Sequence, residues 1–126
     1  PGFSLVASLI TYPELLVGPL RGNDATLLAS YETMFGGDTL LEIMPLDRSL
    51  LRDAARLRAK YQVLKLPDAI HVATALRAGC SHFISGETRF PSMFELPAEN
   101  GTEIARVATL RPDDQGLDML EQLLSR

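Results

Sequence analysis

The chain has 126 residues, of which 46% are hydrophobic and 22% are charged, and its formal net charge at pH 7 is −4. This length suits a single domain with a hydrophobic core, and this composition excludes an intrinsically disordered chain. The negative charge excludes a general attraction to nucleic acid, so any such contact requires a local basic patch or a bound metal ion.

The first third of the chain is predicted to form two helices. The first runs from residue 8 to about residue 20, because Thr11 to Glu14 fits a capping box, and Gly18 and Pro19 disturb its end. The second begins after Asn23 or Asp24, has an apolar face, and ends at a pair of glycines.

The middle of the chain is predicted to form a strand and two further helices. Residues 40–46 are a strand that Pro45 keeps short or places near a sheet edge. A helix capped by Asp47 or Ser49 follows and extends to about Tyr61. Its inward positions are Leu50, Ala54, Leu57 and Tyr61. The next helix spans residues 66–78, with proline near its start and glycine just after its end.

The last third contains shorter elements. Residues 83–84 belong to a buried strand, residues 91–101 form a loop, and residues 104–110 are another strand. A final helix covers about residues 113–125. Helices that alternate with short strands predict an α/β fold with a mainly parallel sheet. We therefore expect one domain over residues 1–126, with a core at about 4–110.

Three acidic residues at the ends of these elements are candidates for chemistry. Asp68 lies in the first turn of the helix at 66–78, where it can serve the helix start or a metal ion. Glu14 can equally close the capping box or bind metal. Glu87 follows the strand at 83–84, at the carboxyl end where sites form in α/β sheets, although an exposed turn is the alternative. His71 can support Asp68 or simply pack.

Basic residues offer weaker signals. Arg48, Arg52, Arg56 and Lys60 recur every four positions, which is more typical of a solvated helix face than of a phosphate-binding stripe. Arg21 and Arg89 follow Glu14 and Glu87, where a cation could hold a phosphodiester. The sequence contains no glycine-rich phosphate loop, zinc cluster or nucleophile elbow, which leaves a carboxylate metal site as the main chemical option.

Three segments resemble the PIN domain family, especially the VapC-type toxins of toxin–antitoxin pairs. They are SLITYPELLVG at 8–18, LPDAIHVATA at 66–75 and FISGETRF at 83–90. Their order matches that of the family, and the resemblance covers about residues 4–95.

The resemblance implies a three-layer α/β/α fold and a ribonuclease that uses Mg²⁺ or Mn²⁺. It places Glu14, Asp68 and Glu87 as catalytic metal ligands and Ser85 as a supporting residue. In such a site the metal generates hydroxide and neutralises charge on the phosphate. RNA is the implied substrate, a cognate antitoxin the implied partner, and a homodimer the implied assembly.

The chain departs from the family pattern in two ways. Glu87 replaces the usual aspartate, and residues 1–13 contain no acid that could serve as the family's first aspartate. We therefore expect the family's first strand to precede this chain, and residues 1–126 by themselves to be a poor nuclease.

A non-catalytic PIN-like module that binds protein or RNA is the main alternative, and another Mg²⁺-dependent phosphoryl-transfer enzyme is a weaker one. The single cysteine, Cys80, excludes an intrachain disulfide, and no apolar run approaches the roughly 20 residues that span a bilayer. We expect a cytoplasmic protein with no membrane contact.

Overall fold

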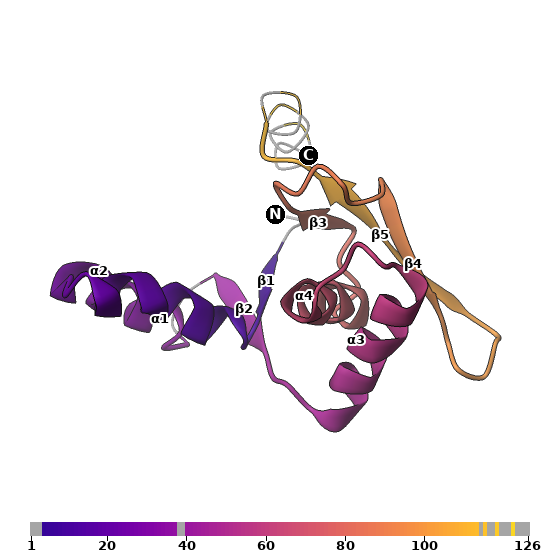
Figure 1. The fold of residues 1–126 in the computed structure, drawn as a ribbon, viewed down its shortest axis with the longest axis horizontal. Helices are drawn as coiled ribbons and strands as arrows, with labels where there is room; N and C mark the ends of the chain where they lie inside the picture. The colour runs from indigo at the N-terminus through magenta and orange to yellow at the C-terminus, as the bar shows by residue number, and fades with distance from the viewer. Residues whose placement is uncertain (1–3, 38–39, 114, 116–117, 119–121, 123–126) are drawn as a thin grey trace.

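Helix α4 (Leu66–Arg77) lies at the centre of the molecule, with two small sheets on different sides of it (Figure 1). The computed structural model describes residues 4–37, 40–113, 115, 118 and 122. One sheet pairs β1 (Leu5–Ser8) with β2 (Leu41–Met44) in parallel. The other has the order β3-β5-β4, in which β3 (His82–Ile84) is parallel to β5 (Ile104–Leu110) and β4 (Met93–Pro97) is antiparallel to it.

The remaining helices pack mainly on other helices. Helices α1 (Thr11–Arg21) and α2 (Ala25–Met34) pack on each other beyond β1 and β2, and α3 (Arg48–Lys60) packs along α4 (Figure 1). The predicted α/β fold with mainly parallel strand pairing is confirmed. Within the described residues, however, the strands form two sheets, since β1 does not pair with β3.

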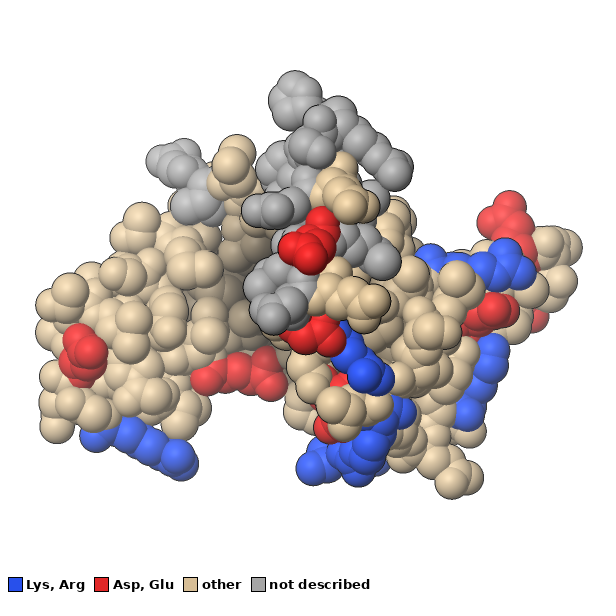
Figure 2. Space-filling model, turned by 90° about the horizontal axis from the view of Figure 1, so that it is seen from above, with Lys and Arg blue, Asp and Glu red and all other residues tan. Residues whose placement is uncertain are grey.

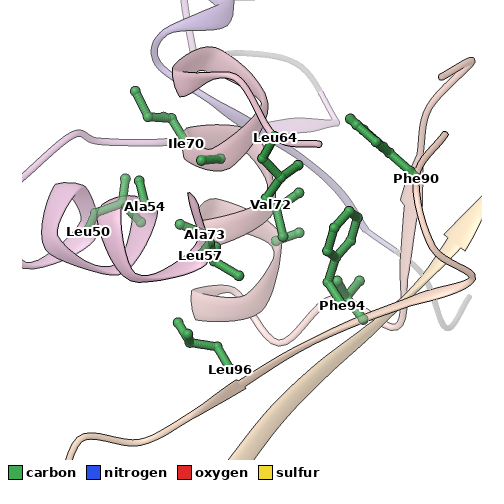
Figure 3. Packing of buried hydrophobic residues seen from close by; sticks show 13 residues of the cluster. Leu50, Ala54, Leu57, Leu64, Ile70, Val72, Ala73, Phe90, Phe94 and Leu96 are labelled. Atoms are coloured by element: carbon green, nitrogen blue, oxygen red, sulfur yellow. The ribbon is translucent and has the colours of Figure 1, made fainter. Parts of the chain in front are cut away.

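The hydrophobic core lies between α3, α4 and the β4–β5 pair (Figure 3). Phe94 of β4 is completely buried, and its ring meets Tyr61, Phe83 and Phe90 edge-on. Its centroid lies 5.0 Å from that of Tyr61 and 5.5 Å from that of Phe90, within the range in which aromatic pairs attract one another. This cluster ties β4 to the end of α3 and to the loop after β3.

Several predicted helix boundaries are confirmed with their causes. The Asp47 carboxylate accepts a hydrogen bond of 2.7 Å from the Leu50 N–H and caps α3, and Leu50, Ala54 and Leu57 are buried. Asp24 caps α2 in the same way. Gly79 follows α4 with φ of +72°, a backbone conformation that glycine adopts without strain.

Other predictions are wrong. Residues 5–8 form β1, which was not predicted, and the first helix therefore starts at Thr11, after Ile10 and without a capping side chain. That helix continues through Pro19 to Arg21, and Pro19 is its one buried residue. Helix α2 carries the expected apolar residues, but none of its residues is buried.

The last third of the chain also differs from prediction. The segment predicted as a loop at 91–101 contains β4, and Ile84 of the strand predicted to be buried is 48% exposed. The predicted final helix lies largely outside the described residues, and the single-domain boundary stays a prediction. None of the described helices is long and apolar enough to cross a membrane.

The aromatic cluster generates a stability prediction. Phe94→Ala should lower the free energy of unfolding by about 3–5 kcal/mol, because it removes a fully buried ring and leaves a cavity. Met93→Ala is the matched control, since Met93 precedes it on β4 and is 40% exposed, and it should change stability by less than about 1 kcal/mol. Denaturant unfolding measures both, and equal losses would contradict this role of Phe94.

Candidate active site

The N-terminal end of α4 brings the predicted acids into one region of the molecule. Asp68 is fixed there by the helix start, because its carboxylate accepts a hydrogen bond of 3.1 Å from the Lys65 N–H. Pro67 occupies one of the first helical positions, where its missing N–H costs nothing. Asp68 thus performs the expected helix-start role and also lines a groove beside α4.

Glu14 reaches this region from α1. Its Oε1 atom lies 2.8 Å from Nε2 of His71, which is one turn beyond Asp68 on α4. The capping-box alternative for Glu14 is not seen, because α1 has no side-chain cap. His71 is therefore more than a packed side chain: it links the acid of α1 to the helix that carries Asp68.

Glu87 reaches the same region from the loop after β3. The Ser85 hydroxyl accepts a hydrogen bond of 3.1 Å from the Glu87 N–H, and the Ser85 N–H donates to the Leu110 carbonyl. These two bonds hold the loop against β5. Ser85 thus contacts the main chain of Glu87, and its orienting role in the site stays a prediction.

Arg89 holds the Glu87 carboxylate in a two-pronged ion pair. Nε and Nη2 of Arg89 each lie 3.0 Å from one of its oxygens, and the Arg89 N–H donates to it as well. These bonds, with a smaller attraction from Lys65, lower the pKa of Glu87 to about 2. The charge of Asp68 also helps to raise the pKa of Arg89, so the two groups interact electrostatically.

The three acids nevertheless do not form a closed metal site. Among the residues that the structure describes, no three His, Cys, Asp or Glu side chains are close enough together to hold a metal ion. The donor chemistry suits a hard cation such as Mg²⁺, since all three are carboxylates. In this arrangement, however, Glu14 is bound to His71 and Glu87 to Arg89, so each of these two acids has its own counter-group.

The predicted basic stripe is used for structure. Arg52 lies 2.6 Å from Glu99, Arg56 contacts Asp53, and Lys60 donates to the Glu95 carbonyl. The contacts of Arg52 and Lys60 join α3 to β4 and the turn after it. On the face drawn in Figure 2, several basic side chains lie beside acidic ones, which fits this pairing. Three of the four residues of the stripe are thus engaged by the protein itself, whereas Arg21 is exposed at the end of α1.

Cys80 behaves as expected for a packed thiol. It is partly buried after α4, and burial raises the pKa of its thiol, which disfavours the reactive thiolate.

Comparison with known proteins agrees with the features of this region. The family model of the PIN domain matches residues 3–95. Among solved structures, a chain of a toxin–antitoxin complex from Klebsiella pneumoniae is similar, with a TM-score of 0.54 and 28% identity. The match covers 65% of this chain and 62% of that chain. None of the curated proteins compared with this chain matches it.

The ion pair at Glu87 generates a pH prediction. Because the pKa of Glu87 is lowered from 4.5 to about 2, the pair stabilises the folded chain above about pH 4.5, and this contribution disappears as the pH falls toward 2. Arg89→Ala should raise the pKa of Glu87 part of the way back, since the main-chain bond from residue 89 remains.

Carboxyl-carbon NMR titration measures this pKa directly. Arg106→Ala is the matched control, because Arg106 lies 3.7 Å from a different acid, Glu95. It should leave the Glu87 titration unchanged. An unaltered Glu87 pKa in Arg89→Ala would show that the guanidinium does not hold this carboxylate.

Proposed function

Because the chain belongs to the PIN domain family, whose members are generally nucleases, we propose that it is a metal-dependent endoribonuclease and the toxin of a toxin–antitoxin pair. The observation that carries this proposal is the meeting of three elements at the N-terminal end of α4. Asp68 lies on this helix, Glu14 reaches it through His71, and the charge of Asp68 acts on Arg89, the ion-pair partner of Glu87. The similarity to a chain of the Klebsiella toxin–antitoxin complex supports the toxin assignment.

Glu14, Asp68 and Glu87 are the proposed catalytic residues and the proposed ligands of Mg²⁺ or Mn²⁺. When bound, such a metal supplies a hydroxide nucleophile and neutralises negative charge on the phosphate. The protein contributes fixed carboxylates: the helix start orients Asp68, His71 orients Glu14, and Ser85 anchors the loop of Glu87. Metal binding requires Glu87 to exchange its ion pair with Arg89 for the cation.

Arg89 has a second proposed role in this exchange. Its side chain is 66% exposed, so it can turn from Glu87 toward solvent. A guanidinium released beside the acids would pair well with a phosphate group of RNA. Arg21 is the other proposed RNA contact. The support for this role is that Arg21 is exposed at the end of the helix that bears Glu14.

A protein partner is part of the proposal. Leucine and valine side chains on α1 and α2 are exposed, with Val17 at 42%, Leu20 at 58% and Leu27 at 38%. Exposed apolar groups on one helical pair favour contact with another chain, either an antitoxin or a second copy in a homodimer. We also propose that the protein acts in the cytoplasm.

Metal binding separates the nuclease from the non-catalytic alternative. Mn²⁺ at ten times its dissociation constant should stabilise the folded chain by roughly 1.4 kcal/mol and raise Tm by a few degrees, because it binds only the folded state. Asp68→Asn should abolish the rise, whereas Glu103→Gln, which alters an exposed acid near β5, should retain it. No rise in the unaltered chain would favour a PIN-like interaction module.

RNA cleavage tests the reaction itself. With excess protein over a labelled RNA, we expect slow cleavage that requires Mg²⁺ or Mn²⁺ and that falls about 100-fold in Glu14→Gln, Asp68→Asn or Glu87→Gln. Circular dichroism should confirm that each variant folds, and Glu103→Gln should cleave normally. Cleavage that persists in Asp68→Asn or in a chelator would contradict the proposed site, and hydrolysis of small phosphate esters instead of RNA would contradict the proposed substrate.

A further inference from the structure

Strand β4 lies at the end of the order β3-β5-β4 and pairs with β5 on one side only, within the described residues. The Thr109 N–H donates to the Ser92 carbonyl, and main-chain direction alternates along an antiparallel strand. The N–H and C=O groups that point away from β5 are therefore those of the residues at odd positions, Met93, Glu95 and Pro97. Such an outer edge readily pairs with another extended chain unless something covers it.

The Tyr61 hydroxyl takes the place of a neighbouring strand at the centre of this edge. The Glu95 N–H donates to it over 2.9 Å, and it lies 3.4 Å from the Glu95 carbonyl, to which it donates. A paired strand would offer Glu95 one acceptor and one donor, and a hydroxyl supplies both. The ring that carries this hydroxyl is held by edge-on packing against the buried Phe94.

Two cations from α3 cover the outward carbonyls of β4. Lys60 Nζ donates to the Glu95 carbonyl over 3.0 Å, and Arg56 donates to the Pro97 carbonyl. Proline has no N–H, so this carbonyl is the one main-chain hydrogen-bonding group of Pro97. Lysine and proline are residues with which proteins commonly keep sheet edges from pairing.

The spacing of the basic stripe on α3 matches the spacing of the strand edge (Figure 1). Lys60 meets residue 95, Arg56 meets residue 97, and Arg52 meets residue 99 through its carboxylate. Four helical residues rise about 6 Å, and two strand residues extend about 6.7 Å. A side chain on every fourth residue of α3 therefore meets every second residue of the chain that runs along it.

The two cations are themselves held in position. Arg56 Nη1 lies 3.2 Å from the Asp53 carboxylate, and its side chain is only 27% exposed. Lys60 Nζ lies 5.3 Å from the centroid of the Tyr61 ring, within the range of a cation–π contact. These contacts limit the movement of long side chains that solvent would otherwise leave free.

We propose that Arg56, Lys60 and Tyr61 form an edge cover, which closes the outer edge of β4 to strand pairing with a second copy of this chain. A second copy is the relevant partner because it presents the same edge, and two identical edges can pair antiparallel about a two-fold axis. The edge cover would thus direct any assembly of the chain to another surface. This proposal rests on main-chain contacts and not on the nuclease activity, so its test needs neither metal nor RNA.

The first measurement is amide hydrogen exchange on the 126-residue chain. Tyr61→Phe keeps the ring that packs on Phe94 but removes the hydroxyl, so the Glu95 amide should exchange at least ~10-fold faster. Tyr12→Phe is the matched control, since it removes a hydroxyl that donates to Glu32 on α2, and it should leave the Glu95 amide unchanged. Unchanged exchange at Glu95 in Tyr61→Phe would overturn the proposal.

The second measurement is self-association by sedimentation. A triple variant that lacks the whole edge cover (Arg56→Ala, Lys60→Ala and Tyr61→Phe) should associate at a concentration at least ~10-fold lower than the unaltered chain does. In the associated form the Glu95 amide should exchange slowly again, because it then pairs with the second copy. If circular dichroism shows that the triple variant is unfolded, the exchange result for Tyr61→Phe decides the proposal.

A second triple variant controls for the loss of charge. It combines Arg48→Ala, Arg58→Ala and Tyr31→Phe, which remove two cations and one hydroxyl from α3 and α2, and it should sediment as the unaltered chain does. Equal association by this control would overturn the proposal. So would a folded variant without the edge cover that does not associate, or one that associates while its Glu95 amide still exchanges fast.

Discussion

The close packing of α4 against its surroundings is the constraint on which the rest of the structure depends. Ala69, Val72 and Ala73 are almost fully buried, so α3 and the strands approach the helix closely. Small side chains make this approach possible, and a larger residue at any of these positions would push a neighbour away. Once α4 is fixed in this way, the position of its first turn is fixed too, and with it that of Asp68.

Electrostatic balance explains why the three acids approach one another without forming a cluster. Ionised carboxylates brought together without a cation repel each other. Each candidate acid instead takes a donor from the chain: Glu14 takes His71, Asp68 takes the Lys65 N–H, and Glu87 takes Arg89. The two-pronged ion pair with Arg89 holds the pKa of Glu87 well below its usual value. A divalent cation must therefore compete with donors that the protein already supplies.

The sequence predicted those elements whose signals are local. The Asp47 cap, the buried face of α3 and the proline and glycine that bound α4 all act within a few residues, and β5 was predicted with its observed limits. Strands β1 and β4 were missed because each is only four or five residues long and is held by pairing with a distant segment. Proline and glycine near β4 also favoured a loop.

The candidate site shows the same division between local and distant information. The helix-start position of Asp68 could be predicted from the Leu-Pro-Asp sequence alone, because it depends on the first turn of one helix. The contact between Glu14 and His71 joins residues 57 positions apart, and nothing in either local sequence indicates it. The spacing of Asp68 and His71 was the available signal, since it places both on one helix face.

The groove and the acids are physically connected through that same face of α4. Asp68 and His71 stand at one end of the groove floor, and Ala78 stands near the other. The surroundings of Asp68 therefore depend on the same helix face that forms the groove floor.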